Sequence, residues 1–260
     1  MSYKTLIYEK DEGVALLKLN RPKTMNALDE TMARELEAVT RDLEQDEDIG
    51  AVVLTGEGDN FCAGGDLRHL MQGFSPVEGP QYVKSIHPWI TGFVNLEKPV
   101  ISAVNGYAVG AGFCIAMLGD ILLAGQKAVF GQLFVQVGLV PDLAGMYLLP
   151  RMVGLQRAKE LVFTGRQIGA EEAMQMGVVS RVLPDDQLLE ESKKLARQLA
   201  AGPRVALRQA KRILNMSGNL NLEELLELEA YAQGLCFQTE DFQEGTRAFM
   251  EKRKPQFKGK

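Results

Sequence analysis

The sequence predicts an α/β fold that ends in a helical region, and three observations support this fold class. Up to about residue 141, apolar runs typical of buried strands alternate with segments in which apolar residues recur at the helical period. Two glycine-rich turns each follow such a run and lead into a helix-like segment. Beyond that point nearly every segment has the helical period. We therefore expect strands joined by right-handed crossovers, followed by helices.

Two strands and a capped helix are expected at the start of the chain. Residues 3–8 and 14–19 are the strands, and the polar residues 10–13 form the turn between them. Asp29 is expected to cap an amphipathic helix, because apolar residues follow it at spacings of four, three and four. The apolar face of that helix consists of Met32, Leu36, Val39 and Leu43.

The middle of the chain continues the alternation. Strands are expected at residues 51–54, 100–104, 121–124 and 128–130. Residues 71–79 contain glycine, serine and proline, so they are expected to form a loop. Helices are expected over residues 82–96, where Lys98-Pro99 then stops the helix, and through residues 114–118.

The C-terminal part is expected to be almost entirely helical. Helical periods cover residues 143–152, 155–164, 170–176, 185–201, 203–216, 222–237 and 241–251. Only residues 178–182 have a strand-like pattern in this part of the sequence. Closely spaced leucines between residues 222 and 228 give more apolar surface than one helix needs. Packing against the chain's own core or against another subunit would explain this surface, and we favour the second.

Composition and charge exclude several classes of function. The 260 residues are 46% apolar and 24% charged, with a formal net charge of −5. This mildly acidic balance, without basic runs interleaved with aromatic residues, argues against a nucleic-acid partner. No apolar stretch is long enough to span a bilayer, and the first residues lack the apolar core of a signal peptide. We therefore expect a cytoplasmic protein without a membrane partner.

Cysteine and histidine usage argues against disulfides and metal binding. Cys62, Cys114 and Cys236 are odd in number and far apart, which favours reduced thiols. His69 and His87 are the only histidines, and no spacing typical of a zinc site occurs, so no metal is expected.

The two glycine-rich turns are the strongest candidates for a functional site. They are residues 61–67 (Phe-Cys-Ala-Gly-Gly-Asp-Leu) and residues 105–112 (Asn-Gly-Tyr-Ala-Val-Gly-Ala-Gly). A small-residue turn between a strand and a helix leaves main-chain N–H groups unpaired and lets a ligand approach closely. Two facing turns can hold one carbonyl oxygen between two amides, as an oxyanion hole does for a thioester that becomes an enolate. Taken singly, each turn is more often only a tight chain reversal, and neither matches a dinucleotide or phosphate-loop fingerprint.

A series of short phrases occurs in order along nearly the whole chain. They are Leu19-Asn20-Arg21-Pro22-Lys23 with Asn26-Ala27-Leu28, Phe61 to Leu67, Lys98-Pro99-Val100 with Asn105-Gly106, Phe130-Gly131-Gln132, Leu149-Pro150-Arg151, and Ala248-Phe249 with Lys252-Arg253. In this combination the chain resembles the crotonase family, also called the enoyl-CoA hydratase/isomerase superfamily. From Gly110 through Asp142 to Glu244-Gly245 it most resembles epoxyphenylacetyl-CoA isomerases and their 3-enoyl-CoA to 2-enoyl-CoA isomerase relatives.

The resemblance implies an architecture and a substrate class. Residues 1–200 are expected to form a spiral of ββα units that binds acyl-CoA. Residues 201–260 are expected to form a helical oligomerisation region that builds homotrimers, commonly paired into hexamers. Coenzyme A enters as part of the substrate, and no separate cofactor is expected.

The resemblance also assigns roles to individual residues. The two main-chain amides that bind the thioester oxygen fall on Gly65 and Ala111, where the commoner residue at the second position is glycine. Segments similar to those that bind coenzyme A contain Lys23, Met25, Ala27, Ala63, Asp66, Leu67 and Arg68. Without the family context, Lys23 and Arg68 are equally well explained as solvated surface charges. Residues 71–80 and those around Phe134 are expected to line the acyl pocket.

Two departures from the family pattern bear on the chemistry. Hydratases of the family carry two glutamates that hold and activate a water, and these positions are occupied here by Cys114 and Phe134. A thiol and a phenyl ring cannot position a water as paired carboxylates do, so ordinary hydration is not expected. Cys114 has no basic partner near it in the sequence and is better explained as a small core residue than as a nucleophile.

Asp142 is the remaining candidate acid. It falls where several family isomerases place a catalytic aspartate, and it precedes a helical segment, so an N-cap is the alternative role. Facing apolar residues, it is expected to have a raised pKa and to move a proton between two carbons of an enolate. The resemblance therefore favours an acyl-CoA isomerase that works with an oxyanion hole and a single aspartate.

Three other functions stay open at this point. One is an enoyl-CoA hydratase-type lyase. Another is a dehalogenase-like or hydrolase-like enzyme, because His87 lies 24 residues before Ala111, as the catalytic histidine does in chlorobenzoyl-CoA dehalogenases. In that case an aspartate matching Asp142 would attack the ring, although a histidine at a helix start is the simpler explanation of His87. The third is a non-catalytic acyl-CoA-binding homologue that has lost its glutamates.

Overall fold

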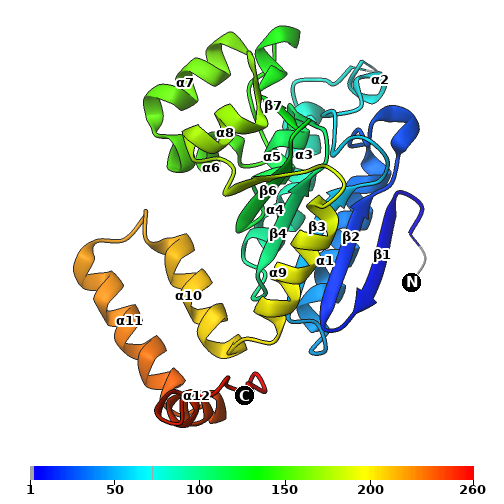
Figure 1. Cartoon of the computed structure of the whole chain (residues 1–260). Helices are drawn as coiled ribbons and strands as arrows, with labels where there is room; N and C mark the ends of the chain where they lie inside the picture. The colour runs from blue at the N-terminus through cyan, green and yellow to red at the C-terminus, as the bar shows by residue number, and fades with distance from the viewer. Residues whose placement is uncertain (1–2, 72) are drawn as a thin grey trace.

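A six-stranded sheet forms the centre of the computed structural model, which describes residues 3–71 and 73–260 without the side chain of His69 (Figure 1). Its strand order is β1-β2-β3-β4-β6-β9. β1 and β2 are antiparallel, and the other neighbouring strands are parallel, so helical crossovers connect them. The strands are β1 (Leu6–Asp11), β2 (Val14–Leu19), β3 (Ala51–Gly56), β4 (Val100–Val104), β6 (Ile121–Gly125) and β9 (Arg181–Leu183).

A three-stranded sheet accompanies the larger one. It consists of β5 (Tyr107–Val109), β7 (Val129–Gly131) and β8 (Gln167–Gly169). β5 and β7 are parallel, whereas β7 and β8 are antiparallel. Because β5 lies inside the second glycine-rich turn, this sheet fixes that turn in space.

Helices cover both faces of the larger sheet because its strands are apolar on both sides. Leu16 and Val53 point toward α9, while Leu17 and Val52, one residue along each strand, point toward α1 and α4. The helices are α1 (Glu30–Gln45), α2 (Leu67–Leu70), α3 (Glu78–Ser85), α4 (His87–Val94), α5 (Ala111–Ala116), α6 (Gly145–Val153), α7 (Leu155–Thr164), α8 (Ala170–Met176), α9 (Leu188–Ala200), α10 (Arg204–Met216), α11 (Leu222–Cys236) and α12 (Glu240–Met250), with 3₁₀ helices η1 (Pro22–Thr24) and η2 (Leu133–Val137).

Several sequence predictions need correction. The helix expected over residues 82–96 is two helices divided at Ile86, because Pro88 has no N–H to donate to the carbonyl of Lys84. β8 was not predicted, since three residues are too few to establish a strand period. β9 begins at Arg181 rather than at residue 178, because the amides of Val178 and Val179 donate to the carbonyl of Ala173 at the end of α8.

Smaller shifts occur at other elements. β1 runs over Leu6–Asp11 instead of residues 3–8. Within the region expected to be a loop, α3 already begins at Glu78. No helix in the described ranges of the chain has the length and apolar character needed to cross a bilayer.

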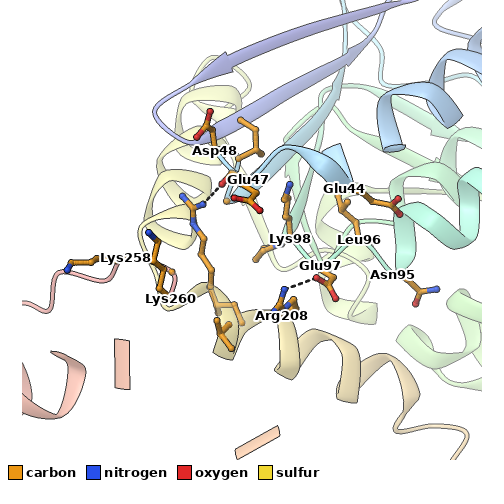
Figure 2. Close-up of a pocket in the computed structure, with 17 residues that line it drawn as sticks. Glu44, Glu47, Asp48, Asn95, Leu96, Glu97, Lys98, Arg208, Lys258 and Lys260 are labelled. Carbon is orange, nitrogen blue, oxygen red and sulfur yellow. Dashed lines mark hydrogen bonds and ion pairs between the residues drawn. The ribbon is translucent and has the colours of Figure 1, made fainter. Parts of the chain in front are cut away.

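The last three helices, α10 to α12, extend away from the sheet and meet the core through α10 (Figure 1). Arg208 forms an ion pair with Glu97 at 2.9 Å (Figure 2). The Arg204 guanidinium donates to the carbonyl of Glu47 at 2.8 Å. These contacts border a hollow of about 870 Å³ lined by acidic and basic side chains. None of the described residues that line it belongs to a glycine-rich turn, so it is separate from the site below.

Large apolar side chains are exposed along these three helices. They include Leu214, Leu222, Leu226, Tyr231, Leu235, Phe237, Phe242, Phe249 and Met250. The helical C-terminal region predicted from the sequence is confirmed, because α10, α11 and α12 make up most of it. Its boundary at residue 201 and its role in oligomerisation remain predictions.

Candidate active site

The two glycine-rich turns lie side by side and are joined through Cys62. The amide of Cys62 donates to the carbonyl of Tyr107 at 2.8 Å, and the amide of Val109 donates to the carbonyl of Cys62 at 3.1 Å. This short parallel pairing of Cys62 with Ala108 connects turns far apart in the sequence. The facing arrangement that the oxyanion hypothesis requires is thus present.

Glycine is required at three positions of this contact. Gly64 and Gly110 have φ values of +110° and +55°, a backbone region that other residues rarely adopt. A Cβ on Gly112 would lie 1.9 Å from the carbonyl oxygen of Cys62, so no side chain fits there. The turns therefore touch backbone to backbone.

The amides of Gly65 and Ala111 are the donors that this contact leaves open. Ala111 is the first residue of α5, where a helix has no internal acceptor for its N–H groups. Among the described residues, neither amide donates a hydrogen bond to the protein. A Cβ on Gly64 would lie 3.8 Å from the Ala111 nitrogen, so the two turns present their free amides close together.

The segment expected to bind coenzyme A lies against the first turn. Ala63 donates its N–H to the carbonyl of Met25 at 2.9 Å, and the Leu28 amide donates to the carbonyl of Gly64 at 2.8 Å. Ala27, between them, is buried, whereas Met25 is 47% exposed. Lys23, on η1, is exposed. The chain thus brings Met25, Ala27 and Ala63 together beside the free amide of Gly65.

Asp66 points toward a partner that the sequence did not reveal. Its carboxylate forms an ion pair with Arg21 at 2.9 Å and accepts the N–H of Arg68 at 3.2 Å. The hydrogen bond from Arg21 holds the pKa of Asp66 below its usual range. Leu67 is 50% exposed, and Arg68 is also exposed, so these two remain available to a ligand.

Asp142 lies between η2 and α6 and is half-buried. Its Oδ1 is inaccessible to solvent and has no hydrogen-bond partner among the described residues. Burial raises the pKa of Asp142 to about 6, although its own main-chain N–H and the charge of His87 act in the opposite direction. The alternative N-cap role is wrong, because α6 begins after Ala144 without any side-chain cap.

Cys114 is fully buried close to Asp142. Its thiol contacts the side-chain amide of Gln132 at 3.6–3.7 Å, and burial raises its pKa to about 12. A Cβ on Gly145 would lie only 2.6 Å from the sulfur, so Gly145 packs directly against the thiol. The thiol is a core group, as the sequence predicts, and at neutral pH it stays protonated.

Aromatic side chains surround the same region. Phe134 is half-buried on η2 and packs against the core. Tyr82 stacks on Phe74 with ring centroids 4.9 Å apart, and burial followed by the negative charge of Asp142 raises the pKa of Tyr82. Tyr82 is therefore a neighbour of Asp142 that sequence reasoning missed, although it lies only two positions after the residues expected to line the acyl pocket.

His87 is exposed at the first residue of α4. It lies near enough to Asp142 to act on the pKa of that carboxyl. Its main-chain carbonyl accepts a hydrogen bond from the hydroxyl of Thr91 at 3.0 Å. The side chain of His69 lies outside the described part of the chain.

The open amides of the two facing turns can polarise a thioester carbonyl. The carboxylate of Asp142, among apolar side chains, can move a proton beside that carbonyl. A mostly parallel sheet, with one of these turns after β3 and the other at the start of α5, is followed by a helical C-terminal region, and this arrangement is that of the crotonase fold.

The comparisons agree with this class. The family model described as enoyl-CoA hydratase/isomerase matches residues 9–260. A crotonyl-CoA hydratase of Syntrophomonas wolfei is 38% identical over 258 residues, covering 99% of each chain. A 1,2-epoxyphenylacetyl-CoA isomerase of Escherichia coli K12 is also 38% identical, over 96% of this chain and 97% of its own. The crystal structure of an enoyl-CoA hydratase/isomerase from Cupriavidus metallidurans CH34 superposes with a TM-score of 0.94 at 36% identity, covering 100% of this chain and 98% of its own.

The chain belongs to the enoyl-CoA hydratase/isomerase family of the crotonase superfamily. The fold class and the family predicted from the sequence are both confirmed. Hydratases and an isomerase occur among these relatives, so the residues of the site have to decide between the reactions.

Proposed function

We propose that the protein is an acyl-CoA isomerase that uses Asp142 as its single acid and base. The thioester oxygen of the substrate binds between the amides of Gly65 and Ala111, which stabilise the enolate. The Asp142 carboxylate removes a proton from a carbon conjugated to the thioester. The resulting carboxylic acid returns the proton to another carbon, so a double bond moves or a ring opens while the mass stays constant.

One observation carries the proposal: the Oδ1 of Asp142 is buried without a partner among the described residues, and positions 114 and 134 carry no second carboxylate. A pKa near 6 keeps Asp142 ionised at neutral pH and still makes it a competent proton donor after it has taken a proton. Hydration needs a water held between two carboxylates in this family, and here Cys114 and Phe134 offer none. The missing carboxylates favour isomerisation over hydration, although several relatives have names that describe hydratases.

The test is a panel of CoA thioesters analysed by mass spectrometry: 3-enoyl, 2-enoyl, epoxyphenylacetyl and chlorobenzoyl. We expect an altered spectrum at constant mass for an enoyl or epoxide substrate, and deuterium incorporation when the reaction runs in D₂O. Asp142→Asn should lower turnover by roughly two to four orders of magnitude. Nearly intact turnover of this variant would overturn the assignment, and a product heavier by one water would mean a hydratase.

A second candidate rests on the proximity of His87 to Asp142. In this alternative the Asp142 carboxylate attacks an aromatic ring, the halide leaves, and His87 activates the water that cleaves the aspartyl ester. Release of chloride from chlorobenzoyl-CoA, lost in His87→Gln, would support it. A protein that only binds acyl-CoA would give neither exchange nor product in any arm of the panel.

We further propose that the partner of this protein, besides acyl-CoA, is a second copy of the same chain. The apolar side chains exposed on α10 to α12 support this proposal, because a monomer gains nothing from leaving them in water. Analytical ultracentrifugation should give a trimer or hexamer. Phe249→Glu, at a side chain that is 85% exposed, should shift the distribution toward monomer while leaving the fold intact.

A further inference from the structure

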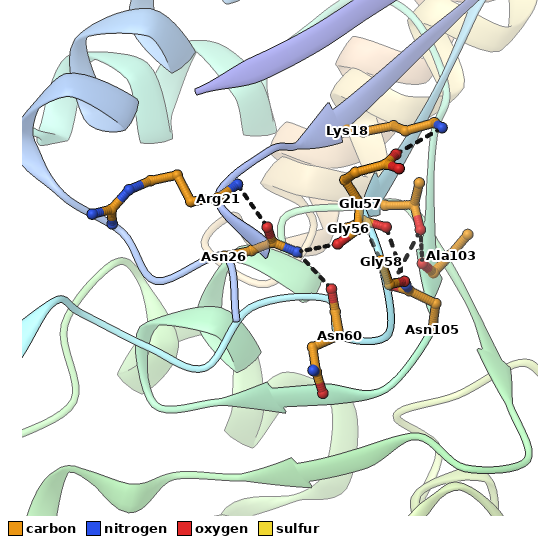
Figure 3. Close-up of polar contacts among 10 residues, drawn as sticks. Lys18, Arg21, Asn26, Gly56, Glu57, Gly58, Asn60, Ala103 and Asn105 are labelled. Atoms are coloured by element: carbon orange, nitrogen blue, oxygen red, sulfur yellow. Dashed lines mark hydrogen bonds and ion pairs between the residues drawn. The ribbon is translucent and has the colours of Figure 1, made fainter. Parts of the chain in front are cut away.

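The buried side chain of Asn26 holds the loop that precedes the first glycine-rich turn. This loop, residues 56–60, begins at the last residue of β3. Asn26 donates both hydrogens of its amide, to the carbonyls of Glu57 at 2.9 Å and Asn60 at 2.7 Å (Figure 3). Its Oδ1 accepts the main-chain N–H of Arg21 at 2.8 Å. The side chain is 0% exposed and fully paired, so it connects the loop rigidly to the segment expected to bind coenzyme A.

Asn105 holds the same loop from the side of the second turn (Figure 3). Its amide donates to the carbonyls of Gly56 at 3.0 Å and Gly58 at 2.7 Å, and its Oδ1 accepts the N–H of Gly56 at 3.3 Å. The next residue, Gly106, presses on the loop directly, since a Cβ there would lie 2.1 Å from the carbonyl oxygen of Asp59. The loop is thus fixed between two asparagines.

The held loop leads directly to the oxyanion donors. The side chain of Asn60 accepts the N–H of Tyr107 at 3.2 Å, and the pairing of Cys62 with Ala108 follows. Gly65 comes three residues after Cys62, and Ala111 three after Ala108. A shift of the loop therefore moves the amide of Gly65 relative to the amide of Ala111.

We propose that Asn26 and Asn105 are positioning residues that set the separation of the two oxyanion amides through the loop of residues 56–60. The inference rests on the proposed function, because the separation matters only if one carbonyl oxygen binds both amides. Donors act when they lie about 2.7–3.1 Å from the oxyanion, and a misplacement of about 1 Å costs on the order of 100-fold in rate.

The direct test measures the polarisation of a bound carbonyl. A saturated acyl-CoA with a ¹³C-labelled thioester carbonyl is bound to the wild type and to Asn26→Asp and Asn105→Asp, and its stretching frequency is recorded by infrared difference spectroscopy. Each variant keeps the size of the side chain but turns a carboxylate oxygen toward main-chain carbonyls. We expect a lowered carbonyl frequency in the wild type, a smaller lowering in both variants, and a kcat reduced about 10- to 100-fold with a KM within about threefold.

The matched control is Asn215→Ala. The Asn215 amide also donates to a main-chain carbonyl, that of Val94 at 3.0 Å, but it joins α10 to α4. This variant should lose thermal stability while keeping the full carbonyl shift and kcat. It therefore separates a general loss of packing from a displaced oxyanion hole.

A milder variant decides the matter if the aspartate variants do not fold. Asn60→Ala removes only the acceptor of the Tyr107 amide at a half-buried site, and it should give an intermediate loss of carbonyl shift and of kcat. A full shift with unchanged kcat in folded Asn105→Asp, or in Asn60→Ala where only that variant folds, would overturn the positioning role. A wild type that binds the thioester without any carbonyl shift would instead overturn the proposed oxyanion hole itself.

Discussion

Gly64 and Gly110 face each other across the two turns, each in a backbone conformation with positive φ. A Cβ added to Gly110 would lie 3.8 Å from the Cα of Gly64, and a Cβ added to Gly64 would lie 3.2 Å from the carbonyl oxygen of Val109. The free amides of Gly65 and Ala111 each follow one of these glycines. The conformation of the two glycines therefore determines where both donors point.

Gly110→Ala should damage catalysis more than binding. The φ of +55° and ψ of −126° at this residue are rarely adopted by residues with a Cβ, so we expect a strain of roughly 1–3 kcal/mol that the turn relieves by rotating the Ala111 amide. The expected kcat loss is on the order of 100-fold. Gly154→Ala, also at positive φ but with open space around it, is the control and should cost stability without lowering kcat. Equal kcat in the two variants would contradict the role of Gly110.

Asp142→Asn should stabilise the fold at neutral pH. Burial raises the pKa of Asp142 from 3.8 to about 6, so the folded protein binds more protons than the unfolded chain between these values, and stability falls as the pH rises through them. The side chain of asparagine has no ionised form, so the variant does not pay the free energy of burying a carboxylate charge. We expect a gain of roughly 1–3 kcal/mol in unfolding free energy above pH 6, which disappears below about pH 4. Urea denaturation at pH 7 and pH 4 measures it, and a variant less stable than wild type at pH 7 would disprove this account.

The pH dependence of catalysis should report the same group. The free enzyme needs Asp142 as a carboxylate, so kcat/KM should fall about tenfold per unit as the pH drops below about 6. A midpoint near the ordinary aspartate value of 3.8 would show that burial has no such effect. Asp142→Glu should retain measurable activity with a midpoint still raised, because the surrounding burial is unchanged.

Cys114 should prove dispensable for chemistry. Its thiol is buried, its pKa is raised to about 12, and it contacts the amide of Gln132 rather than a base. Cys114→Ala should therefore keep kcat within about threefold while losing roughly 1–2 kcal/mol of stability to the small cavity. Loss of turnover in a well-folded variant would make the thiol a participant.

Local patterns predicted much of the fold. β2, β4 and α7 have the expected bounds, and Asp29 caps α1 by accepting the N–H of Met32. Each of these elements is decided by its own residues: an apolar run, a helical period or a capping side chain. Pro88 is a sequence signal for the division of the helix at Ile86, but the apolar residues continue at the helical period on both sides of it and favoured a single helix.

The parts of the site that sequence reasoning missed depend on contacts between distant segments. The pairing of Arg21 with Asp66 joins residues 45 positions apart, and Asn26 reaches residues beyond position 56. No local spacing distinguishes such a buried asparagine from one in a surface turn. The family resemblance predicted the roles of Gly65, Ala111 and Asp142. The contacts that hold the segments around these residues in place are visible only in the structure.

The ion pair of Lys211 and Asp120, whose side chains are 9% and 26% exposed, predicts how α10 is fixed to the core. The two charges lie 2.8 Å apart, and Lys211 also donates to the carbonyl of Lys98 at 3.0 Å. Burial lowers the pKa of Lys211 and raises that of Asp120 despite their attraction, so desolvation outweighs the pairing. Removing one partner should then cost more than removing both.

Lys211→Met should lose roughly 1–2 kcal/mol of unfolding free energy, because it leaves the partly exposed Asp120 carboxylate without its cation. The double variant Lys211→Met with Asp120→Asn should recover at least half of that loss. Asparagine keeps an oxygen for the N–H of Val100, which now donates to Asp120 at 2.7 Å. Chemical denaturation of the wild type, both single variants and the double variant completes the cycle. A double variant as unstable as the sum of the two single variants would show that the charges do not interact across this contact.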